Sequence, residues 1–185
     1  MGAGLISIAC HPDSRTAGGA CPELMVRAVS KREELAQLVS DADVVVVGPG
    51  LGKTHWAEEM YGVCVESEVR KVIDADGLNL LARNPRKLTC SILTPHPGEA
   101  GSLIAQDAKA VQANRPKVIE ELVSKFNATC VLKGAGTLVA QSGYPVMLCN
   151  RGHAGMATPG MGDVLSGIIG ALMAQGVPKR TAAGA

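Results

Sequence analysis

Aromatic residues are almost absent from this chain of 185 residues, which contains one Trp, one Phe and two Tyr. Apolar residues nevertheless make up 46% of the sequence, so the core has to be built from Val, Leu, Ile and Ala. A chain of this length can bury a sizeable aliphatic core. We therefore expect residues 1–185 to form a single domain.

An excess of charge of either sign is also missing. Eighteen basic residues face seventeen acidic ones, and the formal net charge is +1. This balance gives no electrostatic reason to expect a nucleic acid or an anionic membrane surface as a partner. No apolar run reaches the length of about 20 residues that spans a bilayer. The apolar start MGAGLISIAC lacks the basic region of a secretory signal, so we expect a cytoplasmic protein.

Cysteine pairs at metal-binding spacing are absent as well. Six cysteines are scattered along the chain without a C-x-x-C pair: Cys10, Cys21, Cys64, Cys90, Cys130 and Cys149. In a chain of this length the pattern favours reduced thiols over a disulfide framework. Several of them end predicted strands, which favours small buried apolar side chains over metal ligands.

The chain does contain an alternation of strand-like and helix-like segments. Strand patterns cover 5–10, 43–48, 70–76, 90–95 and 128–134, and a hairpin-like segment covers 137–150. Helical patterns cover 31–42, 55–67, 77–84, 111–127 and about 163–175, with Pro116 in a first turn or at a break. Unbroken β-branched strands that alternate with helices predict an α/β fold, with a mostly parallel sheet covered on both faces.

Ligands bind such sheets outside the carboxyl ends of the strands, and the turns at these ends are rich in glycine and polar residues. The turns are GPGLG at 48–52, DADGLN at 74–79, TPHPGE at 94–99 and KGAGT at 133–137. Each turn also has an explanation without a ligand, because glycine turns are often only connections and His96 could be a surface histidine. Asp74 and Asp76 could bind a metal ion or water, or cap a helix. Together the turns favour one ligand site.

The stretch HAGMATPGMGDVLSGIIGAL at 153–172 places three glycines, a proline and Asp163 directly before an apolar helix. Gly167 and Gly170 lower helix propensity, which a close approach between helix and sheet would explain. Apolar residues recur at helical spacing, so one face should pack on the sheet: Val164, Leu165, Ile168, Ile169, Leu172 and Met173.

The glycine run should leave backbone N–H groups free at the start of this helix, where they can bind an anion, phosphate above all. Asp163 could be only the cap of the helix. Beside phosphate-binding amides, however, a carboxylate can take a proton from a hydroxyl group that attacks phosphorus. This arrangement is typical of phosphoryl transfer to small molecules.

Five segments in this order resemble the ADP-dependent NAD(P)H-hydrate dehydratases of the ribokinase-like superfamily: GPGLG, VIDADGLNLL, ILTPHPGEAGSL, VLKGAGTLVA and GMGDVLSGIIGALMAQG. The resemblance covers nearly the whole chain and implies a ribokinase-like three-layer αβα sandwich. It also implies an enzyme, a lyase of metabolite repair that dehydrates the S-epimer of hydrated NADH or NADPH. ADP would be cleaved to AMP and phosphate, with phosphorylation of the ring hydroxyl before elimination.

The resemblance further implies roles for single residues. Asp163 matches the catalytic base, and Gly52, His96 and Asp163 match contacts to the hydrated dinucleotide. The nucleotide (ADP or AMP) would lie along two segments, which are Lys133, Gly134, Ala135, Gly136 and Thr137, and His153, Ala154, Gly155, Met156, Ala157, Thr158, Pro159, Gly160, Met161 and Gly162. Mg²⁺ is implied with the phosphates, without assignable protein ligands. A homo-oligomer and an epimerase domain or protein are implied as partners.

Three departures from the family leave two alternatives open. His153 stands where the family usually has Asn, and Pro159 stands where it has Gly, which removes one N–H donor. Family members also have segments before GAGLIS and after the last helix, so the resemblance implies a partial domain. The alternatives are a small-molecule kinase of the hydroxyethylthiazole-kinase type and a non-catalytic nucleotide-binding remnant. The combination of TPHPGE with KGAGT favours the dehydratase.

Overall fold

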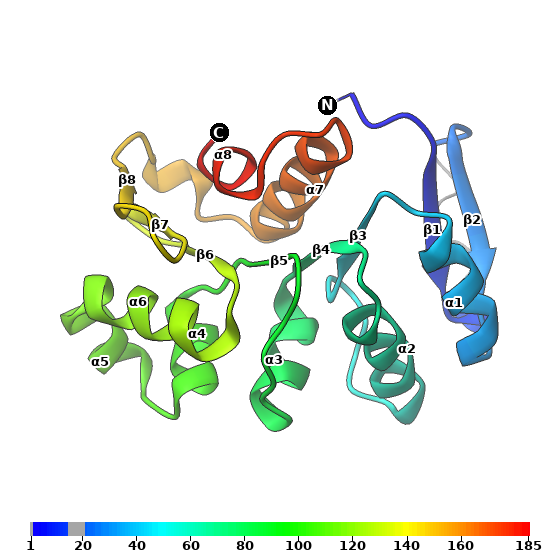
Figure 1. Ribbon diagram of the computed structural model, residues 1–185, viewed down its shortest axis with the longest axis horizontal. Helices are drawn as coiled ribbons and strands as arrows, with labels where there is room; N and C mark the ends of the chain where they lie inside the picture. The colour runs from blue at the N-terminus through cyan, green and yellow to red at the C-terminus, as the bar shows by residue number, and fades with distance from the viewer. Residues whose placement is uncertain (1, 15–20) are drawn as a thin grey trace.

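The computed structural model describes residues 2–14 and 21–185, and in this part of the chain six strands form the central sheet (Figure 1). In spatial order they are β3 (Val44–Val47), β4 (Arg70–Ile73), β5 (Ser91–Leu93), β6 (Thr129–Leu132), β7 (Thr137–Ala140) and β8 (Met147–Cys149). The pairs from β3 to β6 are parallel, whereas β6–β7 and β7–β8 are antiparallel. The expected mostly parallel sheet and the hairpin at 137–150 are confirmed.

Helices cover both faces of this sheet and give it three layers (Figure 1). One face carries α2 (His55–Glu66), α3 (Ala75–Arg83), α4 (Pro97–Ile104), α5 (Ala108–Ala113) and α6 (Arg115–Phe126), and the other carries α7 (Met161–Ala174) and α8 (Lys179–Gly184). A large aliphatic core fills the first side and a smaller one lies under α7 and α8. The αβα sandwich predicted from the sequence is confirmed.

Two further strands form a separate parallel pair, β1 (Ile6–Cys10) and β2 (Leu24–Ala28). β1 is the strand expected at 5–10. β2 was not predicted, because LMVRA contains a charged residue and is only partly buried, which weakens its strand pattern. Helix α1 (Arg32–Ser40) follows β2 and packs against α2. Met1 and residues 15–20, which belong to the expected domain 1–185, lie outside the described residues.

The helix expected at 111–127 is in fact two helices. Asn114 separates α5 from α6, and its side-chain oxygen accepts a hydrogen bond from the Lys117 backbone N–H at 3.4 Å. Pro116 lies in the first turn of α6, as expected, because proline there gives up no helical hydrogen bond.

Two helices were missed. α4 begins at Pro97 inside a segment that we interpreted as a turn, and α8 follows Pro178. The sequence carried a signal for α4, since proline is favoured in a first turn and Glu99 stands at a capping-box position three residues after His96.

Helix α7 begins at Met161, two residues before the expected start. The face that it buries against the sheet is narrower than its apolar pattern suggests. Ile169 and Met173 are buried against the sheet, but Val164 is 55% exposed, so its predicted contact with the sheet is wrong. A Cβ atom at Gly170 would lie 2.6 Å from Cγ2 of Val46, which confirms a close approach of helix and sheet. At Gly167 nothing lies within 4 Å of such an atom, so the same explanation is wrong there.

The cysteines are free thiols, as expected, but only half of them are buried. Cys10, Cys64 and Cys130 are buried, and burial raises the pKa of the Cys64 thiol to about 11. Cys21, Cys90 and Cys149 are exposed, so the expectation of small buried side chains is wrong for these three. Among residues 2–14 and 21–185, no helix combines the length and apolar character needed to cross a bilayer.

We predict that Gly170→Ala lowers the free energy of unfolding by about 1–3 kcal/mol, because the added methyl group overpacks the contact with Val46. Gly167→Ala should raise it by roughly 0.5–1 kcal/mol, because alanine favours the helix and meets open space. Urea denaturation measures both changes. Equal changes in the two variants would contradict the close packing at Gly170.

Candidate active site at the carboxyl edge of the sheet

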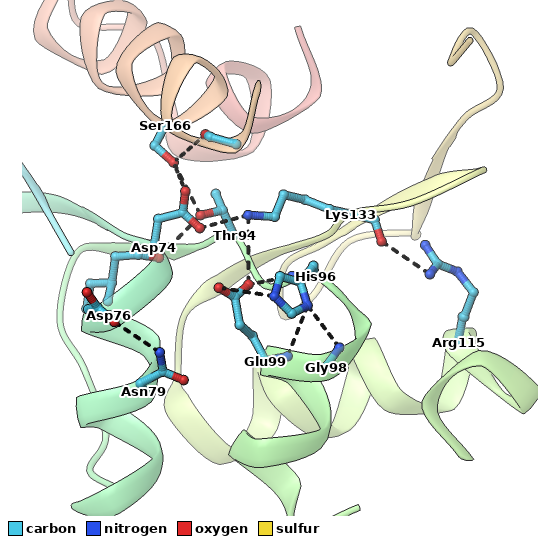
Figure 2. Close-up of polar contacts among 12 residues, drawn as sticks. Asp74, Asp76, Asn79, Thr94, His96, Gly98, Glu99, Arg115, Lys133 and Ser166 are labelled. Atoms are coloured by element: carbon cyan, nitrogen blue, oxygen red, sulfur yellow. Dashed lines mark hydrogen bonds and ion pairs between the residues drawn. The ribbon is translucent and has the colours of Figure 1, made fainter. Parts of the chain in front are cut away.

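Asp74 is the centre of a buried polar cluster at the carboxyl ends of the parallel strands (Figure 2). It follows β4 directly, and its side chain is only 1% exposed. Oδ1 accepts a hydrogen bond from the Lys133 ammonium at 2.8 Å, and Oδ2 accepts one from the Ser166 hydroxyl at 2.5 Å. The cluster therefore joins β4, the turn after β6 and helix α7.

Neither aspartate of the DADGLN turn caps a helix with its side chain. Asp74 stands at the N-cap position of α3, but its carboxylate is engaged with Lys133 and Ser166 instead. Asp76 lies in the first turn of α3 and accepts a hydrogen bond from the Gly52 N–H at 2.9 Å. Asp76 thus anchors the GPGLG loop, and in the described part of the chain no three His, Cys, Asp or Glu side chains gather as a metal site.

The GPGLG loop passes so close to Asp74 that a side chain cannot be accommodated at Gly48. A Cβ atom there would lie 1.8 Å from the backbone oxygen of Asp74, and φ is +124°. Glycine is required at this position by both contact and conformation. The first glycine of the motif therefore allows the close passage of the loop at the end of β3.

His96 caps helix α4 and leaves its ring partly in solvent. Its Nδ1 accepts hydrogen bonds from the backbone N–H groups of Gly98 and Glu99, at 3.0 and 3.3 Å. In the neutral ring the proton is then on Nε2, which lies 3.6 Å from Oε1 of Glu99, too far for a hydrogen bond, in a side chain that is 57% exposed. His96 is thus a helix cap whose ring is half in solvent, and not a plain surface histidine.

Glu99 connects His96 with Lys133. Its Oε2 accepts a hydrogen bond from the His96 backbone N–H at 2.7 Å and lies 3.8 Å from Nζ of Lys133. No role was predicted for Glu99 from the sequence, although it belongs to the TPHPGE motif. The structure places it between the two halves of the predicted site (Figure 2).

The KGAGT turn is held in shape by Arg115, a residue that was not predicted from the sequence. The Arg115 guanidinium donates hydrogen bonds to the backbone oxygens of Leu132, Lys133 and Gly136, at 2.9, 3.3 and 3.1 Å. Arg115 is far away in the sequence and its acceptors are backbone atoms, so no motif signals this contact. The turn is therefore fixed from the side of α6.

The start of α7 presents the free amides that the glycine run predicts. Gly160 is the N-cap in the left-handed conformation, with φ +87°, and Met161 N–H bonds Thr158 O at 3.3 Å. Pro159 and Gly160 are thus the central residues of a type II turn, for which they are well suited. Within the described residues, the N–H groups of Gly162 and Asp163 have no acceptor.

Asp163 is the third residue of α7 and does not cap it. Its side chain is exposed, and no hydrogen bond or ion pair of its carboxylate occurs in the part of the chain that the structure describes. The alternative of a mere N-cap is wrong, since Gly160 holds that position. An exposed carboxylate beside two free amides is a geometry suited to a general base next to a phosphate.

The segment before α7 is exposed from Arg151 to Gly160. A short 3₁₀ turn, Ala154–Met156, follows His153, whose Nδ1 accepts a hydrogen bond from the Gly155 N–H at 3.0 Å. The second predicted nucleotide segment is therefore a surface loop that leads into the free amides of α7.

The structure brings some of the predicted site residues together. Gly162 lies over Lys133, because a Cβ atom at Gly162 would be 3.2 Å from Nζ of Lys133. Lys133 reaches His96 through Glu99, whereas Gly52 is bound to Asp76, two residues after Asp74 in the same turn. No hydrogen bond or ion pair within residues 2–14 and 21–185 links Gly52, His96 and Asp163 directly to one another.

Two open clefts lie away from this edge of the sheet. One, of about 520 Å³, has a mainly apolar lining from α1, α2 and the turn after α2, and the other, of about 440 Å³, lies near Arg70, Tyr144 and Lys179. Neither contains a predicted site residue. Polar chemistry and free donors, not cleft size, therefore mark the candidate active site.

Comparison with known proteins agrees with the family resemblance. Residues 1–185 match the family model of NAD(P)H-hydrate dehydratase. The chain is 45% identical over 184 residues to the bifunctional NAD(P)H-hydrate repair enzyme of Coxiella burnetii, covering 99% of this chain and 38% of that protein. It is 40% identical over 170 residues to the ADP-dependent (S)-NAD(P)H-hydrate dehydratase of Neisseria meningitidis serogroup B, covering 88% and 56%. The chain thus spans only part of these curated relatives.

Solved structures share the fold. A ribokinase-like superfamily protein from Enterococcus faecalis has a TM-score of 0.80 and 28% identity, with 92% of this chain and 61% of that chain covered. The ADP/ATP-dependent NAD(P)H-hydrate dehydratase of Bacillus subtilis, co-crystallised with ATP and Mg²⁺, has a TM-score of 0.75 and 24% identity, with 90% and 60% covered. Because residues 1–185 match the family model, this chain belongs to the NAD(P)H-hydrate dehydratase family, and it has a ribokinase-like α/β fold.

Proposed function

We propose that this chain carries the site for ADP-dependent dehydration of the S-epimer of hydrated NADH or NADPH, which yields NAD(P)H, AMP and phosphate. The observation that carries the proposal is the pair of free N–H groups at Gly162 and Asp163 beside the exposed carboxylate of Asp163. Family membership supplies the substrate class. ADP is the co-substrate, and residues 1–185 form a single dehydratase domain in this proposal.

The two ligands would approach from opposite sides of the Asp74 cluster. The nucleotide lies along 133–137 and 153–162, and these two segments meet where Lys133 lies against Gly162 at the start of α7. The hydrated dinucleotide contacts Gly52, His96 and Asp163. This division fits the structure, because Lys133 belongs to the first side and is joined through Glu99 to His96 on the second.

Mg²⁺ would accompany the phosphates and neutralise part of their charge. The described residues offer no cluster of three metal-ligating side chains, so phosphate oxygens and water would be its main ligands. This agrees with an ion that enters with the nucleotide. The Bacillus subtilis relative was likewise co-crystallised with a nucleotide and Mg²⁺ together.

Phosphorylation of the ring hydroxyl converts a poor leaving group, hydroxide, into a good one, phosphate. Asp163 takes the proton of the ring hydroxyl while that oxygen bonds to the terminal phosphorus of ADP, and AMP leaves with the electron pair of the broken P–O bond. The amides of Gly162 and Asp163 stabilise the negative charge on the transferring group. The C–O bond then breaks, phosphate leaves with its electrons, and loss of a proton from the adjacent ring atom restores the double bond.

A companion epimerase is part of the proposal, because the site acts on one epimer only. The Coxiella relative is named a bifunctional repair enzyme, and this chain covers 38% of it. The companion activity would come from an epimerase domain or a separate protein. We also propose a cytoplasmic setting, where NADH and NADPH are used, and assembly as a homo-oligomer.

The test of the function is recovery of dihydronicotinamide absorbance from hydrated NADH in the presence of ADP and Mg²⁺. Phosphate release with hydrated NADH indicates the dehydratase, whereas a vitamin kinase would convert hydroxyethylthiazole to its phosphate ester without releasing phosphate. A chain that binds ADP without restoring absorbance would be the nucleotide-binding remnant. Absorbance recovery thus marks the dehydratase, formation of the phosphate ester marks the kinase, and nucleotide binding without either product marks the remnant.

We predict that Asp163→Asn lowers turnover by about 10²-fold or more, the usual scale for loss of a general base. The affinity for ADP should change little in calorimetry, because the amides of Gly162 and residue 163 remain. Glu120→Gln, an exposed carboxylate on α6, is the matched control. Turnover like that of the unsubstituted chain would exclude Asp163 as the base.

We predict that His96→Asn raises the Michaelis constant for the hydrated dinucleotide by roughly five- to tenfold, the loss of about one hydrogen bond. Asparagine is chosen because its side chain can still cap α4, whereas the Nε2 donor is lost. The Michaelis constant for ADP should stay nearly unchanged. If both constants rise equally, His96 serves the fold of α4 and not the substrate.

A further inference from the structure

We propose that Ser166 and Asp74 are positioning residues for Asp163, because their hydrogen bond fixes the first turn of α7 on the ends of the strands. The proposal rests on the proposed function, since Asp163 is the base of that reaction. Ser166 and Asp74 do not touch the substrate. They act through the backbone of α7, which carries the Asp163 carboxylate and the free N–H groups of residues 162 and 163.

Apolar packing contributes little to the position of the first turn of α7. The loop before the helix is exposed from Arg151 to Gly160. Within the helix, Asp163 and Val164 are exposed and Leu165 is only partly buried. Ser166 is the first buried residue of α7, with a relative exposure of 0%. The position of this turn therefore depends on what Ser166 contacts.

Ser166 is a polar residue on the buried face of α7. Ile169 and Met173 follow it on this face and pack with apolar residues of the sheet. Alanine would fit the same space and favour the helix, whereas a buried hydroxyl is costly unless it is hydrogen-bonded. The serine therefore indicates that a directional contact is needed at this position.

The hydrogen bond between Ser166 and Asp74 has one possible direction. An ionised carboxylate has no proton to give, so the Ser166 hydroxyl donates and Oδ2 of Asp74 accepts, at 2.5 Å. The Lys133 ammonium holds Oδ1 at 2.8 Å and the Asp74 side chain is 1% exposed, so the carboxylate is kept from turning toward water. Figure 2 shows the two side chains pointing toward each other from α7 and from the end of β4. Hydrogen bonds to a charged group are roughly twice as strong as neutral ones.

Thr94 and the first turn itself place the Ser166 hydroxyl from further sides. Oγ1 of Thr94, which follows β5, lies 3.5 Å from Oγ of Ser166 and 3.3 Å from the backbone oxygen of Ile73. Oγ of Ser166 is also 3.1 Å from the backbone oxygen of Gly162, the residue before Asp163. The hydroxyl is thus located relative to the ends of two strands and to the first turn of α7.

Lys133 packs beneath the same turn. A Cβ atom at Gly162 would lie 3.2 Å from Nζ of Lys133 and 3.7 Å from Oδ2 of Asp74. Glycine at this position lets the start of α7 rest on the ion pair, and the ammonium blocks a shift of the turn toward the sheet. The Ser166 hydrogen bond prevents the opposite shift, away from the sheet.

These contacts bear on the chemistry because Asp163 precedes Ser166 by three residues, which is less than one helical turn. A rotation or a lift of the first turn moves the Cα–Cβ bond of Asp163 with it. Proton transfer depends steeply on geometry, and a displacement of about 1 Å can lower a rate by about 10²-fold. Loss of the support therefore lowers kcat more than it weakens the binding of either ligand.

The first test is Ser166→Ala in the full chain, assayed with hydrated NADH, ADP and Mg²⁺. We expect kcat to fall by about tenfold, while both Michaelis constants change by less than about threefold. Ser102→Ala is the matched control: the exposed Ser102 hydroxyl also bonds the backbone oxygen four residues before it, Gly98 O at 3.2 Å, and has no partner on another element among the described residues. It should leave kcat unchanged. An unchanged kcat in Ser166→Ala would overturn the proposal.

A double variant distinguishes positioning of Asp163 from a general structural role. If Ser166 acts through Asp163, adding Ser166→Ala to Asp163→Asn causes no further loss of turnover, because the base is already missing. A second tenfold loss in the double variant would mean that Ser166 serves the fold instead. All variants are assayed well below their Tm. Ser166→Cys, which keeps the shape of the side chain but donates only weakly, gives the same comparison with less risk to the fold.

A second measurement does not depend on catalysis. The Val164 N–H donates to the Gly160 backbone oxygen at 3.0 Å and closes the first turn of α7. We expect its hydrogen exchange, followed by NMR, to become about tenfold faster in Ser166→Ala, the factor for about one lost hydrogen bond. It should stay unchanged in Ser102→Ala. Unchanged exchange at Val164 in Ser166→Ala would contradict the support of this turn by Ser166.

Exchange and turnover together separate this proposal from the proposed function. If exchange at Val164 responds to Ser166→Ala but the unsubstituted chain restores no absorbance from hydrated NADH, the dehydratase function fails and the support of the first turn stands. If the unsubstituted chain restores absorbance and Ser166→Ala does so with the same kcat, the function stands and the positioning role fails.

Discussion

The buried carboxylate of Asp74 is the interaction on which the site depends. A carboxylate removed from water is costly unless it is paired and hydrogen-bonded, and Asp74 is both. Its two oxygens face different elements: the Lys133 ammonium on one side and the Ser166 hydroxyl on the other. The positions of the turn after β6 and of α7 are therefore set relative to β4 by one side chain.

Three glycines make the approach of these elements possible. Gly48 lets the loop after β3 pass the backbone of Asp74, Gly162 lets α7 lie against Lys133, and Gly170 lets the same helix contact Val46 on β3. In each case a Cβ atom would meet another atom of the protein at close range. The glycine-rich turns thus serve tight packing at the strand ends as much as contact with a ligand, which the motifs alone do not separate.

The sequence predicted the layers better than the contacts. The run TCVL in β6 identifies a strand that is buried on both faces, whereas VVVV belongs to the edge strand β3, where Val46 is exposed. The position of the carboxyl ends of both strands follows from parallel pairing. Periodicity gives the spacing of apolar residues but not the width of the packed face, so Val164 was placed wrongly. Arg115 and Glu99 were missed because their partners are distant in sequence or are backbone atoms. The roles of Asp163, His96 and the nucleotide segments remain predictions.

Ser166 links the buried cluster to the exposed chemistry. Its hydroxyl donates to Asp74, and the residue lies one turn after Asp163 on the same helix. Because a helix is rigid over one turn, a hydrogen bond that fixes the rotation of α7 at Ser166 also fixes the direction in which Asp163 leaves the helix. The buried cluster thus sets the backbone position and the Cα–Cβ direction of the proposed base, while the side-chain torsions of Asp163 stay free in solvent. The final orientation of this carboxylate therefore has to come from the substrate hydroxyl that it contacts.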